Sequence, residues 1–149
     1  MRFMMLMIPG VYQGSNGKQA GTDFTPSAEM VEKMTKFNEE LAKADALLAL
    51  DGLHPPAAAA RVSFRGGKAS VSDGPFTETR EVLGGYWVIQ AKSREEAVGW
   101  ARRVPAQDGD VIEIRQIFEN EEFPPDARRA ADSPVVRRQV QKAGRGQRP

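Results

Sequence analysis

Cysteine is absent from the chain of 149 residues. This absence excludes a disulfide framework, a thiolate nucleophile and any metal site with cysteine ligands. Histidine is nearly absent too, because His54 is the one histidine in the sequence. One histidine among scattered carboxylates does not make a cluster of metal ligands. We therefore expect neither a metal nor an organic cofactor, and a chain without cysteine suits a reducing cytoplasm.

Long hydrophobic runs are also missing. The N-terminal apolar segment has six residues, Phe3 to Ile8, and ends before Pro9. It is shorter than the apolar core of a signal peptide and far shorter than a membrane-spanning helix. The segment therefore predicts a buried first strand, and no association with a membrane is expected.

The motifs of several well-known enzyme classes do not occur. The sequence has no G-x-G-x-x-G after a strand, no phosphate-binding loop ending in G-K-[ST], no G-x-S-x-G and no H-E-x-x-H. These absences argue against a dinucleotide-binding domain, a P-loop nucleotidase, an α/β-type serine hydrolase and a zinc protease.

Charge is distributed unevenly along the chain. Residues 126–149 contain seven Arg or Lys and two Asp, whereas the remainder contains fourteen Arg or Lys and eighteen Asp or Glu. The sequence predicts one mildly acidic domain over residues 1–123 and a basic tail over residues 124–149, partly disordered or helical. Ser133-Pro134 interrupts the helical pattern of the tail. A solvated extension is the favoured interpretation, so nucleic acid is not an expected partner.

Two amphipathic helices are expected. Residues 26–44 have the pattern of the first, with Thr25 as its N-cap and Pro26 at the first helical position. Its apolar stripe has spacings of four, three and four and consists of Met30, Met34, Phe37 and Leu41. Ser93, with Glu96 three residues later, is a capping-box signal that predicts the start of the second helix.

The segment between residues 62 and 71 predicts a β-hairpin with a defined register. Gly66-Gly67 is a favoured two-residue turn, because glycine readily takes positive φ angles. Counting outwards pairs Arg65 with Lys68, Phe64 with Ala69, Ser63 with Ser70 and Val62 with Val71. Apolar residues then face apolar ones and polar residues face polar ones, so the turn and the pattern agree.

Further strands are expected around residues 47–50, 85–92 and 110–119. With the first strand and the two helices they give the order β-α-(β)-β-β-α-β, which is the split βαβ pattern of ferredoxin-like α+β folds. The strands carry more apolar surface than two short helices cover, namely Val62, Phe64, Tyr86, Val88, Ile112 and Ile114. We therefore expect two sheets to face each other in a homodimer.

Asp73 stands where the second hairpin strand ends, in the stretch SDGPF of residues 72–76. It lies two residues after Val71, so a continued strand directs it to the apolar, core-facing side of the hairpin. A carboxylate there is costly unless it is hydrogen-bonded, paired or lining a cavity. Two interpretations follow: a general acid/base in a pocket, or a turn in which the carboxylate accepts the N–H of Phe76 or Thr77.

His54 is flanked by Leu53 and by a double proline that would fix its direction. Imidazole is the side chain that exchanges protons most readily near neutral pH, which suits a proton shuttle. The alternative is a hydrogen-bonded surface histidine in a loop.

Three further residues near this stretch are candidates for substrate binding. Arg61 would steady an anionic substrate or pair with a carboxylate, but it faces opposite to Val62, so an inward role needs an irregular start of the strand. Phe76 would form a wall of the pocket. Glu78 would add a second carboxylate, or it would solvate the first turn of a short helix after Pro75.

One motif is specific enough to indicate a family. DGPFTETRE followed by GGYW, with flanking segments from MRFMMLMI to EIRQIFENEEF, resembles the YCII-related, DGPF-domain family of small bacterial proteins. The resemblance covers about residues 1–123. It implies a ferredoxin-like dimeric α+β barrel, in agreement with the order of elements above.

The resemblance also implies a pocket near the dimer interface, with an aspartate and a histidine as an acid/base pair. The aspartate of the motif is Asp73 in this chain. The family's usual histidine lies in the first helix, where this chain has Phe37 and Asn38, so His54 is its substitute. Relatives that share the barrel act on small, often aromatic or lactone-type substrates.

Two functions are therefore open. The first is a small-molecule enzyme without an organic cofactor, in which Asp73 acts as base or orients His54. The second is a non-catalytic ligand-binding or partner-binding dimer, in which the motif is a structural turn. Similarity of this branch to proteins encoded beside extracytoplasmic-function sigma factors would place the second in a regulatory setting. The first requires the two side chains to lie within hydrogen-bond or one-water reach.

Overall fold

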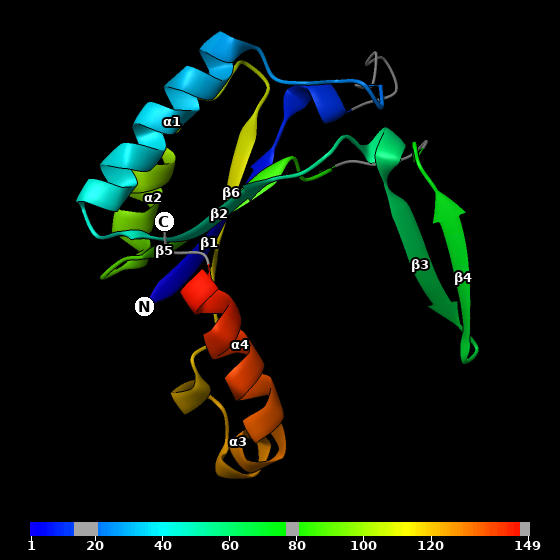
Figure 1. The fold of residues 1–149 in the computed structure, drawn as a ribbon, viewed down its shortest axis with the longest axis vertical. Coiled ribbons are helices and arrows are strands. Elements are labelled where there is room, and N and C mark those ends of the chain that lie inside the picture. Colours follow the sequence, from blue (N-terminus) through cyan, green and yellow to red (C-terminus); the bar gives the residue numbers. More distant parts are fainter. Residues whose placement is uncertain (14–20, 77–80, 147–149) are drawn as a thin grey trace. The chain divides into compact units, whose positions relative to one another are not determined.

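A computed structural model of the chain describes residues 1–13, 21–76 and 81–146 and divides the chain into two compact units, Met1–Ile117 and Phe118–Pro149 (Figure 1). The larger unit combines antiparallel sheets with helices, so the predicted α+β class is confirmed. No helix in the described part of the chain is long and apolar enough to cross a membrane.

A four-stranded sheet is the framework of the larger unit. Its strands are β1 (Arg2–Ile8), β2 (Leu47–Gly52), β5 (Gly85–Gln90) and β6 (Val111–Gln116), in the order β2-β5-β1-β6. Each neighbouring pair is antiparallel. β1 and β2 flank one helix in sequence and β5 and β6 flank the other, so the chain twice passes from a strand through a helix to a strand that is not its neighbour.

Helix α1 (Ala28–Lys43) begins two residues later than the sequence predicts. Ser27 is its N-cap, and its side chain accepts the N–H of Met30 at 3.2 Å. The prediction of Thr25 as the cap is therefore wrong, because Ser27 offers the same oxygen closer to the start of the apolar stripe. Helix α2 (Arg94–Ala101) begins as predicted, with Ser93 as its N-cap.

Both helices lie on the same face of the four-stranded sheet (Figure 1) and bury the core there. The core residues include Phe3 and Met5 of β1, Trp87 and Ile89 of β5, and Phe37 and Leu41 of α1. The indole N–H of Trp87 donates to Asn38 Oδ1 at 2.8 Å. Asn38 thus satisfies the one polar atom of a buried aromatic ring.

Successive side chains of each strand point to opposite faces of this sheet. The face opposite the core carries half-buried apolar residues, among them Met4, Leu6 and Val88. Ile112 and Ile114 pack against the helix-covered core. The prediction that they belong to a surplus of uncovered apolar surface is therefore wrong. The mistake arises because period-two alternation identifies two faces of a strand but not which one the helices cover.

Strands β3 (Ala60–Arg65) and β4 (Lys68–Asp73) form a separate two-stranded sheet (Figure 1). Their register is the predicted one throughout, and both turn glycines have positive φ angles, 56° at Gly66 and 74° at Gly67. The apolar face is exposed, however, with Val62, Phe64 and Val71 55%, 78% and 70% accessible. Val62 and Phe64 thus belong to the surplus apolar surface expected from the sequence, whereas the expectation that Asp73 lies on a core-facing side is wrong for the single chain.

The smaller unit contains α3 (Pro125–Ala131) and α4 (Pro134–Gly146). The predicted interruption at Ser133-Pro134 is confirmed, since α3 ends before this pair and α4 begins at its proline. α4 continues to Gly146, so the basic tail is helical up to this residue.

Candidate functional site

The base of the β3–β4 hairpin is a tight backbone junction. Gly74, directly after β4, donates its N–H to the carbonyl oxygen of Ala59 at 2.7 Å. A Cβ atom added at Gly74 would lie 1.9 Å from the carbonyl oxygen of Pro56, far inside the contact distance. Glycine is therefore required here, and the Gly-Pro step of the motif fixes the end of β4 against the buried prolines 55 and 56.

This junction brings the segments of the two predicted catalytic residues together. Asp73 is the last residue of β4 and pairs with Ala60, the first residue of β3. His54 lies two residues before Pro56, whose carbonyl group contacts Gly74. Both side chains are exposed in the single chain. The junction thus places their backbones close to each other, while no hydrogen bond joins the two side chains in the described residues.

The geometry of Asp73 bears on both interpretations of the motif. Within the described ranges its carboxylate has neither a hydrogen bond nor an ion pair with a protein group. An acceptor role toward the N–H of Thr77 concerns a residue outside those ranges. By register Asp73 shares the face of Val62 and Val71, so its carboxylate borders the exposed apolar surface of the hairpin.

Two of the predicted substrate-binding residues are in contact. The guanidinium carbon of Arg61 lies 3.9 Å from the centre of the Phe76 ring, a cation–π geometry. The β3–β4 register is regular from its first pair, so Arg61 faces away from the side that carries Asp73. The junction therefore separates an Arg61–Phe76 pair on one side from Asp73 on the other. The predicted residue Glu78 lies outside the described residues.

A further acid lies three residues before His54 and is missed by the sequence patterns. Tyr86 of β5 donates its hydroxyl to Asp51 Oδ2 of β2 at 2.6 Å. This hydrogen bond raises the pKa of Tyr86 above its usual range, and loss of solvent and the negative charge of Asp51 act in the same direction. The pair belongs to two strands that are remote in sequence, so no local spacing reveals it.

Gln13 anchors the segment that follows the motif. Its Oε1 accepts the N–H groups of Glu81 at 2.6 Å and Val82 at 3.2 Å, and its Nε2 donates to the Val82 carbonyl oxygen at 3.0 Å. Two residues later, a Cβ atom at Gly84 would lie 2.3 Å from Pro9 Cγ. The first glycine of the Gly-Gly pair thus permits close approach to the end of β1.

No cluster of three or more His, Asp or Glu residues suited to a metal ion occurs among the residues that the structure describes. In the Asp51–Tyr86 pair the phenol proton is already donated to Asp51, so the pair offers acceptor oxygens. The chemistry offered at the hairpin base is therefore proton exchange and hydrogen bonding, together with one guanidinium for an anion.

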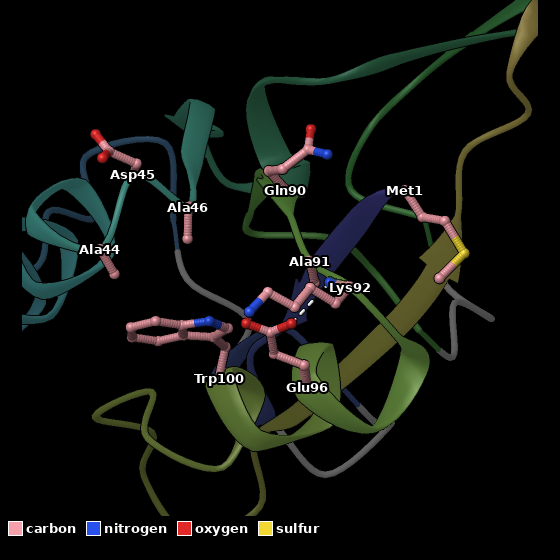
Figure 2. A pocket seen from close by; sticks show the side chains of 9 residues that line it. All are labelled: Met1, Ala44, Asp45, Ala46, Gln90, Ala91, Lys92, Glu96 and Trp100. Carbon is pink, nitrogen blue, oxygen red and sulfur yellow. Dashed lines mark hydrogen bonds between the residues drawn. The ribbon is translucent and has the colours of Figure 1, made fainter.

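A cavity of about 250 Å³ lies at the other end of β5 (Figure 2). Trp100 forms one of its walls, and Lys92 and Glu96 lie beside the indole. The Glu96 carboxylate accepts the N–H of Lys92 at 2.7 Å, which places it at the α2 N-terminus. None of the residues predicted from the sequence to form the site lines this cavity.

Comparisons with known proteins agree with the resemblance in the motif. A family model described as the YCII-related domain matches residues 1–121. An uncharacterized protein of Rhizobium meliloti (strain 1021) is 44% identical over 50 residues, which are 34% of this chain and 40% of that protein. The aligned part thus spans less than half the length of this curated relative.

Proposed function

The chain belongs to the YCII-related family, and we propose that within this family it is a cytoplasmic homodimer that binds a small molecule at the base of its β3–β4 hairpin. In this proposal Asp73 is the acid/base group and His54 is its partner. The pocket is completed by the second copy.

The sheet order supports a ferredoxin-like fold for the larger unit. In β2-β5-β1-β6, the two β-α-β segments interleave, as the split βαβ pattern requires. Both helices occupy one face, and the other face keeps the half-buried residues Met4, Leu6 and Val88. Pairing of two such faces about a two-fold axis gives the dimeric α+β barrel.

The hairpin supports the same assembly. Its face with Val62, Phe64 and Val71 is exposed in a single chain, although burial of such side chains contributes about 1.5–3 kcal/mol each. A second copy offers matching apolar surface, because a two-fold interface uses the same patch on both subunits. Asp73 borders this face and would be enclosed with it.

The observation that carries the proposal is the contact between Gly74 and the Pro56 carbonyl oxygen. It holds Asp73 at the end of β4 beside the segment of His54. Enclosure by the second copy would lower the local dielectric constant and strengthen a carboxylate–imidazole interaction. A histidine beside a carboxylate can then take a proton from a bound substrate and return it.

The remaining residues have supporting roles in this proposal. Arg61, which faces away from Asp73 in the single chain, would bind the anionic group of a substrate that extends around the hairpin base, and Phe76, on which its guanidinium lies, would form an apolar wall. Glu78 would add a second carboxylate. Asp51 lies near His54 in sequence, and its pair with Tyr86 adds acceptor oxygens to the uncovered sheet face.

One observation favours a second function, that of a non-catalytic ligand-binding or partner-binding dimer in a sigma-factor-linked setting. The Asp73 side chain is exposed in the single chain and has no hydrogen bond to His54 among the described residues. In this alternative the motif serves to fix the hairpin, and Gly74 rather than Asp73 is its essential residue.

The Asp73→Asn variant separates the two functions. The proposal expects nearly unchanged melting, since the carboxylate is exposed in the single chain, together with altered binding of a small aromatic carboxylate such as benzoate, observed by saturation-transfer NMR. Asp108→Asn, at an exposed turn of the same unit, is the matched control. A melting temperature lowered by several degrees with unchanged benzoate binding would favour the structural role.

A further inference from the structure

The smaller unit contains a concave surface of its own, and five of the six residues that line it lie outside the region that the family model matches. Its volume is about 490 Å³, within the range of small-molecule sites. The residues that line it are Asn120, Arg128, Arg129, Ala131, Asp132 and Arg137. Three of these six are arginines and one is an acid, so the cavity has an excess of positive charge.

One of the three arginines is held in place by the acid. Arg137 Nη2 lies 2.9 Å from Asp132 Oδ1, across the break between α3 and α4. Arg128 and Arg129 belong to the last turn of α3. Neither has an ion pair with a carboxylate in the part of the chain that the structure describes. Two guanidinium groups of the cavity therefore have no ion-pair partner among the described residues.

The surrounding helix does not supply the missing negative charge. α4 contains no Asp or Glu, and Arg138 and Lys142 add further positive charge to the same helix. Guanidinium groups remain charged at any physiological pH, so the repulsion cannot be relieved by loss of a proton. An anion in the cavity would relieve it.

We propose that this cavity binds the phosphate group of a small phosphomonoester. Arg128 and Arg129 present planar forks of N–H donors, which match the oxygens of a phosphate in bidentate geometry. Arg137, oriented by Asp132, adds a third donor group, and the side chain of Asn120 adds an amide. A single phosphate fills a small part of 490 Å³, so the cavity also has room for the organic part of the ester.

The cavity favours a small ligand over a polynucleotide. Its arginines converge on one concave site, whereas a nucleic-acid backbone requires positive charge spread along an extended track. Arg128 and Arg129 line the same cavity as Arg137. The three guanidinium groups thus border one confined volume, which suits a terminal phosphate with two negative charges.

Binding of inorganic phosphate and of phenyl phosphate to the full chain tests the proposal by isothermal titration calorimetry at constant ionic strength. The double variant Arg128→Gln/Arg129→Gln should weaken binding about tenfold or more, since it removes charge-assisted hydrogen bonds. Arg138→Gln/Lys142→Gln removes the same charge from α4 outside the cavity and should change binding about twofold or less. Circular dichroism of each variant verifies that α3 and α4 are retained.

Three results would overturn the proposal. The first is the absence of binding at millimolar phenyl phosphate. The second is equal weakening by both double variants, which would assign the effect to the general charge of the unit. The third is tighter binding of a single-stranded oligonucleotide, with a steep dependence on salt and equal sensitivity to both double variants, which would identify a nucleic-acid surface.

Discussion

The backbone of Gly74 lies against the carbonyl oxygen of Pro56 so closely that a Cβ atom at Gly74 would come within 1.9 Å of that oxygen. This contact joins the two segments with the most distinctive sequence, the one that carries His54 and the one that carries Asp73. It also explains why the motif contains glycine, for a reason independent of any catalysis. The contact between Gly74 and Pro56 fixes the position of the β3–β4 hairpin at its base.

Gly74→Ala should therefore destabilise the protein by about 1–3 kcal/mol or more, the usual cost of forcing atoms into a packed site. Urea denaturation measures this loss. Gly99→Ala is the control, because Gly99 lies within α2 and a Cβ atom there meets no atom within 4 Å. Alanine in a helix is favoured over glycine by roughly 0.5–1 kcal/mol, so this variant should be more stable. Equal stability of the two variants would contradict the account of the junction.

The Asp51–Tyr86 hydrogen bond predicts a change in tyrosine titration. The chain has two tyrosines, and the pKa of each is raised: that of Tyr86 mainly by its bond to Asp51, that of Tyr12 by burial. Ultraviolet absorbance of tyrosinate should therefore appear above the pH at which an exposed tyrosine ionises, about 10. In Asp51→Ala, which removes the acceptor, the Tyr86 component should move to lower pH while the Tyr12 component stays. An unchanged curve would exclude the bond in solution.

Burial of Tyr12 also predicts a dependence of stability on pH. Its folded-state pKa is raised, so the folded protein holds the phenolic proton more tightly than the unfolded chain. The stabilisation is fully present below the unfolded pKa of about 10 and is lost as the pH rises through the folded pKa. Tyr12→Phe should weaken this alkaline loss in chemical denaturation measured between neutral and alkaline pH. Identical alkaline profiles for the two proteins would argue against a buried phenol.

The hairpin predicts how the proposed homodimer can be broken. Phe64→Asp places a charge on the face proposed to meet the second copy, and burial of an unpaired charge is strongly unfavourable. Sedimentation velocity should show dissociation at a concentration at least about tenfold higher than for the wild-type protein. Ser63→Asp introduces the same residue on the other face of β3 and should leave the dimer intact. A wild-type monomer at micromolar concentration would remove the basis of the proposed assembly.

The elements that could be predicted from the sequence are those determined by residues close to each other along the chain. The β3–β4 register follows from the Gly66-Gly67 turn and from alternation over a few residues, and it is correct at each predicted pair. The start of α2 follows from Ser93, which is again local. Ser27 displaced Thr25 as the cap of α1 because two capping residues stand two positions apart and pattern alone does not rank them.

The parts that could not be predicted depend on contacts between remote residues. Tyr86 meets Asp51 across 35 positions, and Gln13 meets Val82 across 69. The alternation of apolar and polar residues does not show which face of the sheet the helices cover. The sequence therefore places Ile112 and Ile114 wrongly on the uncovered surface. The exposure of Asp73 beside the apolar hairpin face could not be predicted from the alternation either, since a face that packs against another subunit would have the same composition as one buried within a chain.

The interaction of His54 with Asp73 is the central claim, and NMR tests it most directly. His54 is the one histidine, so its imidazole C2–H signal is identified without isotope labelling. We predict that Asp73→Asn shifts this signal at pH 7 in the dimer, whereas Asp108→Asn leaves it in place. A His54 signal that is identical in the wild-type protein and in both variants would contradict the proposed acid/base pair.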